Sequence, residues 1–154
     1  MKLSKILSPD LIKIGLESGS KEEVIRELIA VLDNNGLVRD ADQAFSDVIE
    51  RELQQSTGLE KGIAIPHGKS DSVSRLVGVL GICAQGIDFS SFDGEPSQMF
   101  FLLIAPPDQL TQHIKALANI AKMSQNAAFR RRILKAQTPD EAFDIIKEIE
   151  ASEE

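Results

Sequence analysis

Apolar and polar positions alternate with two different periods in the first third of the chain. The run "DLIKIGL" (10–16) alternates residue by residue, which is typical of a short strand. Ser20 and Glu23 then form a capping-box pattern, and apolar residues follow at helical spacing. A second helix is predicted to begin near Asp40 or Asp42. Its predicted apolar face consists of Ala44, Phe45, Val48, Ile49 and Leu53.

The rest of the chain predicts three strands and then three helices. The strand-like runs cover 62–65, 76–84 and 97–105, and "FDGEP" between the last two carries an Asp-Gly turn signal. The predicted helices cover about 110–124, about 127–136, and a last segment that begins at Thr138. The first of these helices is predicted to pack through Ile114, Leu117, Ile120 and Ala121.

The predicted element order is β-αα-βββ-ααα, which indicates the α/β class. Strands this apolar, combined with this much helix, favour a single sheet that is covered on both faces. The chain has 154 residues and contains no internal repeat or linker. We therefore expect one domain that covers residues 1–154.

Composition excludes several classes of function. The net charge is −7 and the basic residues are scattered, so no nucleic-acid partner is expected. The longest apolar run, "MFFLLIA" (99–105), is too short for a membrane span, and "MKLSKILSPD" lacks the apolar core of a signal peptide. Cys83 is the only cysteine, lies in an apolar stretch and is expected to be buried. These features predict a cytoplasmic protein that does not insert into membranes.

The stretch "GIAIPHGKSD" (62–71) places one of the two histidines directly after a proline. Pro66 cannot donate a ladder hydrogen bond, so the strand is expected to stop there and His67 to project from its end. Gly68 allows another backbone or a partner protein to approach the ring closely. Imidazole is largely neutral and nucleophilic at neutral pH. The stretch alone leaves two readings open: a reactive histidine, or one that merely caps a strand.

Three familiar chemistries are not supported. The letters "GKS" (68–70) resemble the end of a phosphate-binding loop, but five residues lie between Gly62 and Gly68 where four are required. Two histidines and one cysteine, without an HExxH motif, provide no metal-ligand cluster. No G-x-S-x-G is present, which argues against a serine hydrolase. Neither a metal nor a cofactor is expected.

Other polar residues become informative when they are taken together with His67. Arg51, Ser56 and Thr57 precede the strand, and His113 lies near the start of a later helix. Each has an ordinary structural reading: a surface charge, turn residues, and a polar position on a helix. Together they supply what phosphoryl transfer to a histidine needs, namely a neutral nucleophile, a planar cation and hydrogen-bond partners.

The chain resembles the IIA proteins of the bacterial phosphoenolpyruvate-dependent sugar phosphotransferase system, in the fructose/mannitol class that includes the nitrogen-regulatory branch. The resemblance is carried by "RELQQSTGLEKGIAIPHGK" (51–69), "GIDFSSFDGEP" (86–96) and "HIKALANIA" (113–121), and it covers essentially the whole chain. It implies a three-layer α/β/α sandwich with a single mixed sheet, which agrees with the predicted element order.

The resemblance also implies a role for each candidate residue. His67 matches the histidine that is phosphorylated on Nε2 by the phosphohistidine of the carrier HPr or of a paralogue. Arg51 matches the arginine beside the phosphoryl group, and His113 matches a second active-site histidine. Ser56 and Thr57 match positions that line the same pocket. The chain is thus expected to act as a phosphotransferase component, a relay for phosphoryl groups.

Two roles remain open within this class. In a transport role, the phosphoryl group passes from His67 to a cysteine of a IIB partner during sugar uptake. In a regulatory role, the added charge on His67 switches binding to other proteins. The transport role is the leading hypothesis. The sequence does not identify the sugar, the donor among HPr and its paralogues, or the oligomeric state.

Overall fold

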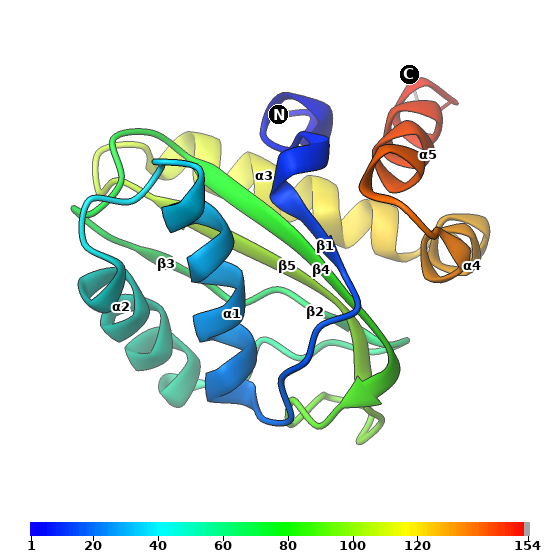
Figure 1. The fold of residues 1–154 in the computed structure, drawn as a ribbon, viewed down its shortest axis with the longest axis horizontal. Coiled ribbons are helices and arrows are strands. Elements are labelled where there is room, and N and C mark those ends of the chain that lie inside the picture. The colour runs from blue at the N-terminus through cyan, green and yellow to red at the C-terminus, as the bar shows by residue number, and fades with distance from the viewer. Residues whose placement is uncertain (153–154) are drawn as a thin grey trace.

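The computed structural model describes residues 1–152, so the last two positions of the expected domain, 153–154, lie outside the described residues. Within this range the chain forms five α-helices, five strands and two short 3-10 helices (Figure 1). The elements are η1 (Leu3–Lys5), η2 (Pro9–Leu11), β1 (Ile12–Ile14), α1 (Lys21–Asn34), α2 (Ala41–Gln54), β2 (Ile63–Ala64), β3 (His67–Lys69), β4 (Val77–Ile87), β5 (Ser97–Ala105), α3 (Leu110–Ser124), α4 (Ala127–Lys135) and α5 (Pro139–Ser152).

The strands form one mixed sheet in the order β1-β4-β5-β2. β3 also pairs with β5, at residues 103–105, after the two residues of β5 that pair with β2. The long central strands β4 and β5 are antiparallel, with Leu80 opposite Phe101. The three short strands are parallel to their neighbours: β1 pairs with β4, while β2 and β3 both pair with β5. The mixed sheet is confirmed.

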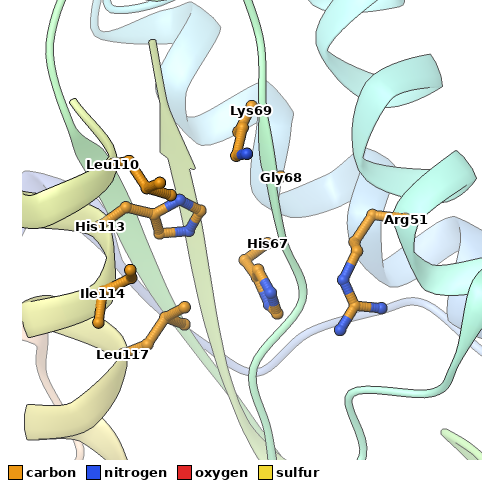
Figure 2. Close-up of a pocket in the computed structure, with 8 residues that line it drawn as sticks. All are labelled: Arg51, His67, Gly68, Lys69, Leu110, His113, Ile114 and Leu117. Atoms are coloured by element: carbon orange, nitrogen blue, oxygen red, sulfur yellow. The ribbon is translucent and has the colours of Figure 1, made fainter. Parts of the chain in front are cut away.

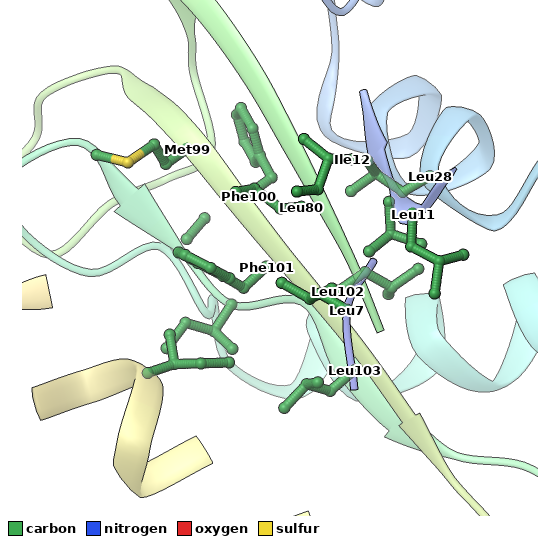
Figure 3. Close-up of a cluster of buried hydrophobic side chains, with 14 of the residues drawn as sticks. Leu7, Leu11, Ile12, Leu28, Leu80, Met99, Phe100, Phe101, Leu102 and Leu103 are labelled. Atoms are coloured by element: carbon green, nitrogen blue, oxygen red, sulfur yellow. The ribbon is translucent and has the colours of Figure 1, made fainter. Parts of the chain in front are cut away.

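Helices cover both faces of this sheet (Figure 1). On one face α1 packs against β4 and α2 against β3, whereas on the other α3 packs against β5 and α5 against β1. Neighbouring side chains of β5 therefore point into different layers. Phe100 packs against Phe89, with ring centroids 5.4 Å apart, and Phe101 stacks on Phe129 of α4 at 6.4 Å. Figure 3 shows the apolar cluster around these strands, and the three-layer α/β/α architecture is confirmed.

The middle of the chain contains one strand more than the sequence predicts. The strand expected at 62–65 is only two residues long, and a further strand, β3, begins at His67. Pro66 does interrupt the ladder, but its carbonyl still accepts a hydrogen bond from Leu103 N at 3.1 Å. The chain therefore stays beside β5 and resumes pairing immediately. The first strand is also shorter than expected, because Pro9–Leu11 forms a 3-10 turn.

The predicted apolar faces of α2 and α3 are confirmed in part: Ala44, Val48 and Ile120 are buried, but each helix also exposes residues that were predicted to pack. Leu53 is 75% exposed while its neighbour Glu52 is buried, and Ile114 is 56% exposed while His113 is buried. The prediction from apolar spacing was wrong at these positions because Glu52 and His113 are polar and yet buried, which hydropathy does not indicate. Glu52 is bonded to Lys21 and Thr57 inside the protein. Ala121 is also exposed, so the buried stripe of α3 is rotated by about one residue from the predicted one.

The predicted helix starts are confirmed by their caps. Ser20 Oγ accepts a hydrogen bond from Glu23 N at 3.3 Å, and Asp40 Oδ1 accepts one from Gln43 N at 3.1 Å. Thr138 Oγ1 does the same for the backbone amide of residue 141 at 3.1 Å. Cys83 is buried, as expected. None of the helices within 1–152 is long and apolar enough to span a membrane.

Candidate functional site

A pocket of about 370 Å³ opens where α2, β3 and the start of α3 meet (Figure 2). It brings together three of the residues singled out from the sequence, which are Arg51, His67 and His113. The complete lining consists of Arg51, His67, Gly68, Lys69, Leu110, His113, Ile114 and Leu117. Three elements that are far apart in the sequence therefore meet at one site.

His67 is held in a defined orientation by its own backbone. Its Nδ1 lies 2.7 Å from the carbonyl oxygen of Ile65. Because a carbonyl can only accept, this bond assigns the ring hydrogen to Nδ1 and leaves the lone pair on Nε2. Pro66 lies between the two residues, in the break between β2, which ends at Ala64, and β3, which begins at His67.

The pKa of His67 is lowered from its ordinary value. Burial is the largest cause, and the positive charge of Arg51 acts in the same direction. The hydrogen bond to Ile65 and the negative charge of Glu52 act in the opposite direction and are outweighed. The ring is therefore neutral at pH 7, which is the form in which Nε2 can act as a nucleophile.

Arg51 reaches the pocket from the last turn of α2. Its Nη1 donates a hydrogen bond to the carbonyl of Gln55 at 3.0 Å, which fixes the side chain at the helix end. Figure 2 shows the guanidinium on one side of His67 and the ring of His113 on the other. A guanidinium has five N–H donors, so the bond to Gln55 leaves donors for an anion bound at His67.

His113 lies in the first turn of α3 and is only 3% exposed. Its ring meets that of His67 edge-on, with centroids 5.4 Å apart and planes at 80°. Burial, followed by the charges of His67 and Lys69, lowers the pKa of His113 to about 4. Its Nε2 is buried without a hydrogen-bond partner among the described residues. His113 is thus a neutral ring with an unused polar atom beside the nucleophile.

Ser56 and Thr57 do not line the pocket, so the expectation that they form its wall is not met. The backbone amide of Thr57 donates to Glu52 Oε2 at 2.8 Å, and its hydroxyl donates to the other oxygen of Glu52. Ser56 Oγ donates to the carbonyl of Phe89 at 2.7 Å. Both side chains are used to hold the segment that follows α2, behind Arg51.

The sequence analysis missed several residues that the fold brings to this region. Glu52 is the buried centre of the network behind Arg51, and it also accepts from Lys21 Nζ at 2.9 Å. Lys69 lines the pocket, and its position two residues after His67 on the same strand could have indicated this. Leu110 and Ile114 are exposed apolar residues at the rim, which no local sequence signal reveals. Residues 1–152 contain no cluster of His, Cys, Asp or Glu able to hold a metal ion.

Comparison with known proteins identifies the family to which the chain is similar. Residues 5–149 match the family described as "Phosphoenolpyruvate-dependent sugar phosphotransferase system, EIIA 2". The "PTS system fructose-specific EIIABC component" of Bacillus subtilis (strain 168) is 34% identical over 148 residues, which make up 96% of this chain and 23% of that protein. This chain therefore spans less than a quarter of that relative's length.

Two further similarities point to the nitrogen-regulatory branch. The "Nitrogen regulatory protein" of Klebsiella oxytoca is 32% identical over 155 residues, covering 100% of this chain and 95% of the relative. The crystal structure of nitrogen regulatory protein IIA-Ntr from Neisseria meningitidis superposes with a TM-score of 0.86 at 26% identity, covering 94% of this chain and 98% of that one. Similarity is therefore divided between a protein named as a fructose-specific component of the PTS system and proteins named for nitrogen regulation.

Proposed function

The chain belongs to the EIIA 2 family of the phosphoenolpyruvate-dependent sugar phosphotransferase system, and we propose that it is a phosphocarrier that accepts a phosphoryl group on Nε2 of His67. The observation that carries the proposal is the bond between His67 Nδ1 and Ile65 O, which leaves Nε2 as the ring nitrogen with a free lone pair. The proposed donor is the phosphohistidine of HPr or of a paralogue.

The transfer exchanges one P–N bond for another. The Nε2 lone pair of His67 attacks phosphorus, the bond between phosphorus and the donor's ring nitrogen breaks, and that nitrogen keeps the electron pair. The hydrogen on Nδ1 of His67 remains bonded to the Ile65 carbonyl throughout. Because both donor and product are phosphohistidines, the protein needs to position the groups and offset charge without trapping the phosphoryl group.

Two cations are available for that charge. Arg51 approaches His67 from α2 and can hold phosphoryl oxygens with a planar pair of N–H donors. Lys69 follows His67 on β3 and lines the same pocket. His113 supplies a further polar atom from α3. These three side chains surround the nucleophile, so charge that develops on the transferring group meets positive or hydrogen-bonding partners.

The rim of the pocket suits a transient partner. Leu110 and Ile114 are 47% and 56% exposed and flank the entrance, so they give a donor protein apolar surface close to His67. The onward acceptor in the transport role is a cysteine of a IIB partner. This cysteine has to come from another domain or chain, because Cys83 is the only cysteine here and is buried.

Phosphorylation by purified components tests the proposal. Phosphoenolpyruvate, enzyme I and HPr together are expected to label one site through a bond that is labile in acid and stable in alkali, as a phosphoramidate is. His67→Ala is expected to abolish the label and to leave the fold intact, because the ring is only partly buried. Label that survives in His67→Ala, or that has the stability of a serine phosphate, contradicts the proposal.

A second candidate function is regulatory. It is favoured by the 32% identity over the full length of a protein named as a nitrogen regulator. In this role, phosphorylation of His67 changes the affinity for a regulatory target. Mixing the phosphorylated chain with the IIB domain from the same genome separates the two roles. Loss of label to a IIB cysteine supports transport, whereas retained label together with altered binding of another protein supports regulation.

A further inference from the structure

The buried Nε2 of His113 has no hydrogen-bond partner within the described residues. Leaving a polar nitrogen unsatisfied in a protein interior costs free energy, so such an atom calls for a functional explanation. Figure 2 shows the ring of His113 turned towards His67, and the two ring centroids are 5.4 Å apart. A partner for this nitrogen is therefore best supplied from the pocket, on the side where His67 stands.

The charged groups around His113 are cationic. His67 and Lys69 face it from β3, and Arg51 lies across the pocket on α2. None of the eight lining residues in the described part of the chain is acidic. β5, on which α3 packs, presents the apolar side chains Leu103 and Ala105 beside β3.

The remaining neighbours of α3 include one acidic group, the buried Glu150 of α5, which accepts a hydrogen bond from Asn119 at 3.2 Å, six residues after His113 on α3. η1 carries the exposed Lys5. α4 meets the far end of α3, where Arg130 Nη1 donates to the carbonyl of Ser124. On α3 itself, the next charged residue is the exposed Lys115. Burial and these cations explain why the pKa of His113 falls to about 4, so the ring binds no second proton at neutral pH.

A phosphoryl group on His67 reverses this environment, a step that rests on the proposed function. It brings about two negative charges and three acceptor oxygens into the pocket, offset in part by the His67 ring, which becomes cationic when Nε2 is bonded to phosphorus and Nδ1 keeps its hydrogen. An opposite charge within about 4–6 Å raises the pKa of a base by roughly 1–3 units. The unsatisfied Nε2 of His113 also gains an acceptor, provided that it carries hydrogen.

We propose that His113 binds a proton when His67 is phosphorylated, so that phosphoryl acceptance by this chain is coupled to the uptake of one proton. The proton comes from solvent and makes His113 an imidazolium whose Nε2–H donates to a phosphoryl oxygen. The new P–N bond at Nε2 of His67 and the hydrogen on its Nδ1 are unaffected. When the phosphoryl group leaves, His113 returns its proton to solvent.

Proton uptake makes the equilibrium depend on pH in a defined window. Between the two pKa values of His113, in the free and the phosphorylated chain, phosphoryl acceptance becomes up to tenfold less favourable for each unit of rising pH. Outside that window the contribution of His113 is constant. The chain would therefore retain its phosphoryl group better at lower pH, which couples the relay to proton concentration.

Ring-proton NMR titration of the whole chain tests this directly. The chain has only two histidines, so His113→Gln assigns both ring signals. Spectra of the free chain are recorded from pH 3.5 to 9. Spectra of the phosphorylated chain, maintained by phosphoenolpyruvate, enzyme I and HPr, are recorded over the near-neutral and alkaline range in which the acid-labile phosphoramidate survives. The pKa of His113 is expected to lie near 4 in the free chain and to rise by at least roughly 2 units in the phosphorylated one. A His113 pKa that stays within half a unit overturns the proposal.

Two variants test whether His113 titrates with phosphorylation or has only a structural role. The equilibrium ratio of labelled chain to labelled HPr is expected to fall with rising pH more steeply in the native chain than in His113→Gln, which cannot titrate. Lys69→Gln removes a neighbouring cation and is expected to raise the His113 pKa in the free chain. Identical pH slopes for the native chain and His113→Gln contradict the coupling.

The same samples separate failure of this inference from failure of the proposed function. A ³¹P spectrum reports whether His67 is phosphorylated at all. A phosphohistidine signal with an unmoved His113 pKa overturns the proton coupling alone. Absence of that signal under full phosphorylating conditions overturns the phosphocarrier function, and the coupling with it.

Discussion

Gly68 packs so closely against Val48 that a Cβ on the glycine would lie 3.3 Å from the Val48 Cα. The same Cβ would lie 3.4 Å from the carbonyl oxygen of Asp47. The absence of a side chain therefore lets the backbone of β3 lie directly on α2. Through this contact Arg51, at the end of α2, reaches the pocket of His67, which follows it by sixteen positions in the sequence.

Gly68→Ala is expected to separate β3 from α2 by a few tenths of an ångström. We expect a loss of about 1–2 kcal/mol in the free energy of unfolding, because the new methyl group overpacks the contact. Phosphorylation of His67 should also slow, since Arg51 moves away from the nucleophile. Urea unfolding and the initial rate of labelling by HPr measure the two effects.

Gly19→Ala is the matched control for that substitution. Gly19 has open space around the Cβ position and an ordinary backbone conformation, so its replacement should change the unfolding free energy by less than about 0.5 kcal/mol. If the two variants have the same stability and the same labelling rate, the contact between Gly68 and Val48 affects neither folding stability nor phosphorylation.

Arg51 tests the charge stabilisation of the transferring group. A charge-assisted hydrogen bond contributes roughly 1.5–3 kcal/mol, or about one to two decades in rate if it forms mainly in the transition state. Arg51→Lys is expected to slow labelling at saturating HPr, because an ammonium cannot provide the planar pair of donors. Arg51→Ala should slow it further. A rate within twofold of the native chain in Arg51→Ala would mean that Arg51 is only a helix-surface charge.

Glu52 tests the network behind the pocket. Glu52→Gln removes the charge that pairs with Lys21 and weakens the bonds that hold Thr57. We expect a loss of roughly 1–3 kcal/mol in the free energy of unfolding, because these donors are left poorly satisfied in a buried site.

Glu50→Gln is the control for the loss of Glu52, because it removes the same charge from an exposed position of the same helix. It should change stability by less than about 0.5 kcal/mol. Labelling by HPr should slow in Glu52→Gln alone, since the segment that carries Gln55 also fixes Arg51. Equal stability of the two variants would show that the buried network contributes nothing measurable.

The sequence selected three residues that the fold brings together, but it did not predict what surrounds them. His67, Arg51 and His113 could be selected because phosphoryl transfer to a histidine needs these residue types, and the fold brings all three to one pocket. Ser56 and Thr57 were assigned to the pocket by resemblance alone, and the direction of their side chains depends on where Glu52 and Phe89 lie. These hydrogen bonds depend on how the folded chain brings the partners together, so no local pattern in the sequence predicts them.

The type of each element could be predicted where one sequence pattern dominated. The buried face of a helix could not be predicted where polar residues are buried. The caps at Ser20, Asp40 and Thr138 fixed three helix starts correctly. In contrast, hydropathy placed Leu53 and Ile114 inside, although both are exposed. The buried polar groups of this site are hydrogen-bonded to one another or, like His113 Nε2, have no partner among the described residues, and hydropathy registers neither condition.

Stability should depend on pH through His113. Its pKa is about 4 in the folded chain and near 6.5 when unfolded. The unfolded state therefore binds more protons between these values, so stability is fully present above pH ~6.5 and is lost as pH falls towards 4. The difference in unfolding free energy between the native chain and His113→Gln should shift by up to about 3 kcal/mol over this range. A difference that is constant from pH 7 to pH 4 contradicts the lowered pKa.

The central claim is that Nε2 of His67 carries the phosphoryl group. Proton–nitrogen correlation NMR of the ¹⁵N-labelled chain, phosphorylated by phosphoenolpyruvate, enzyme I and HPr, reports which ring nitrogen is bonded to phosphorus. We predict phosphorus on Nε2 of His67, with Nδ1 still carrying the hydrogen that it donates to Ile65. Phosphorus on Nδ1 of His67, on His113, or on any other side chain would contradict the account.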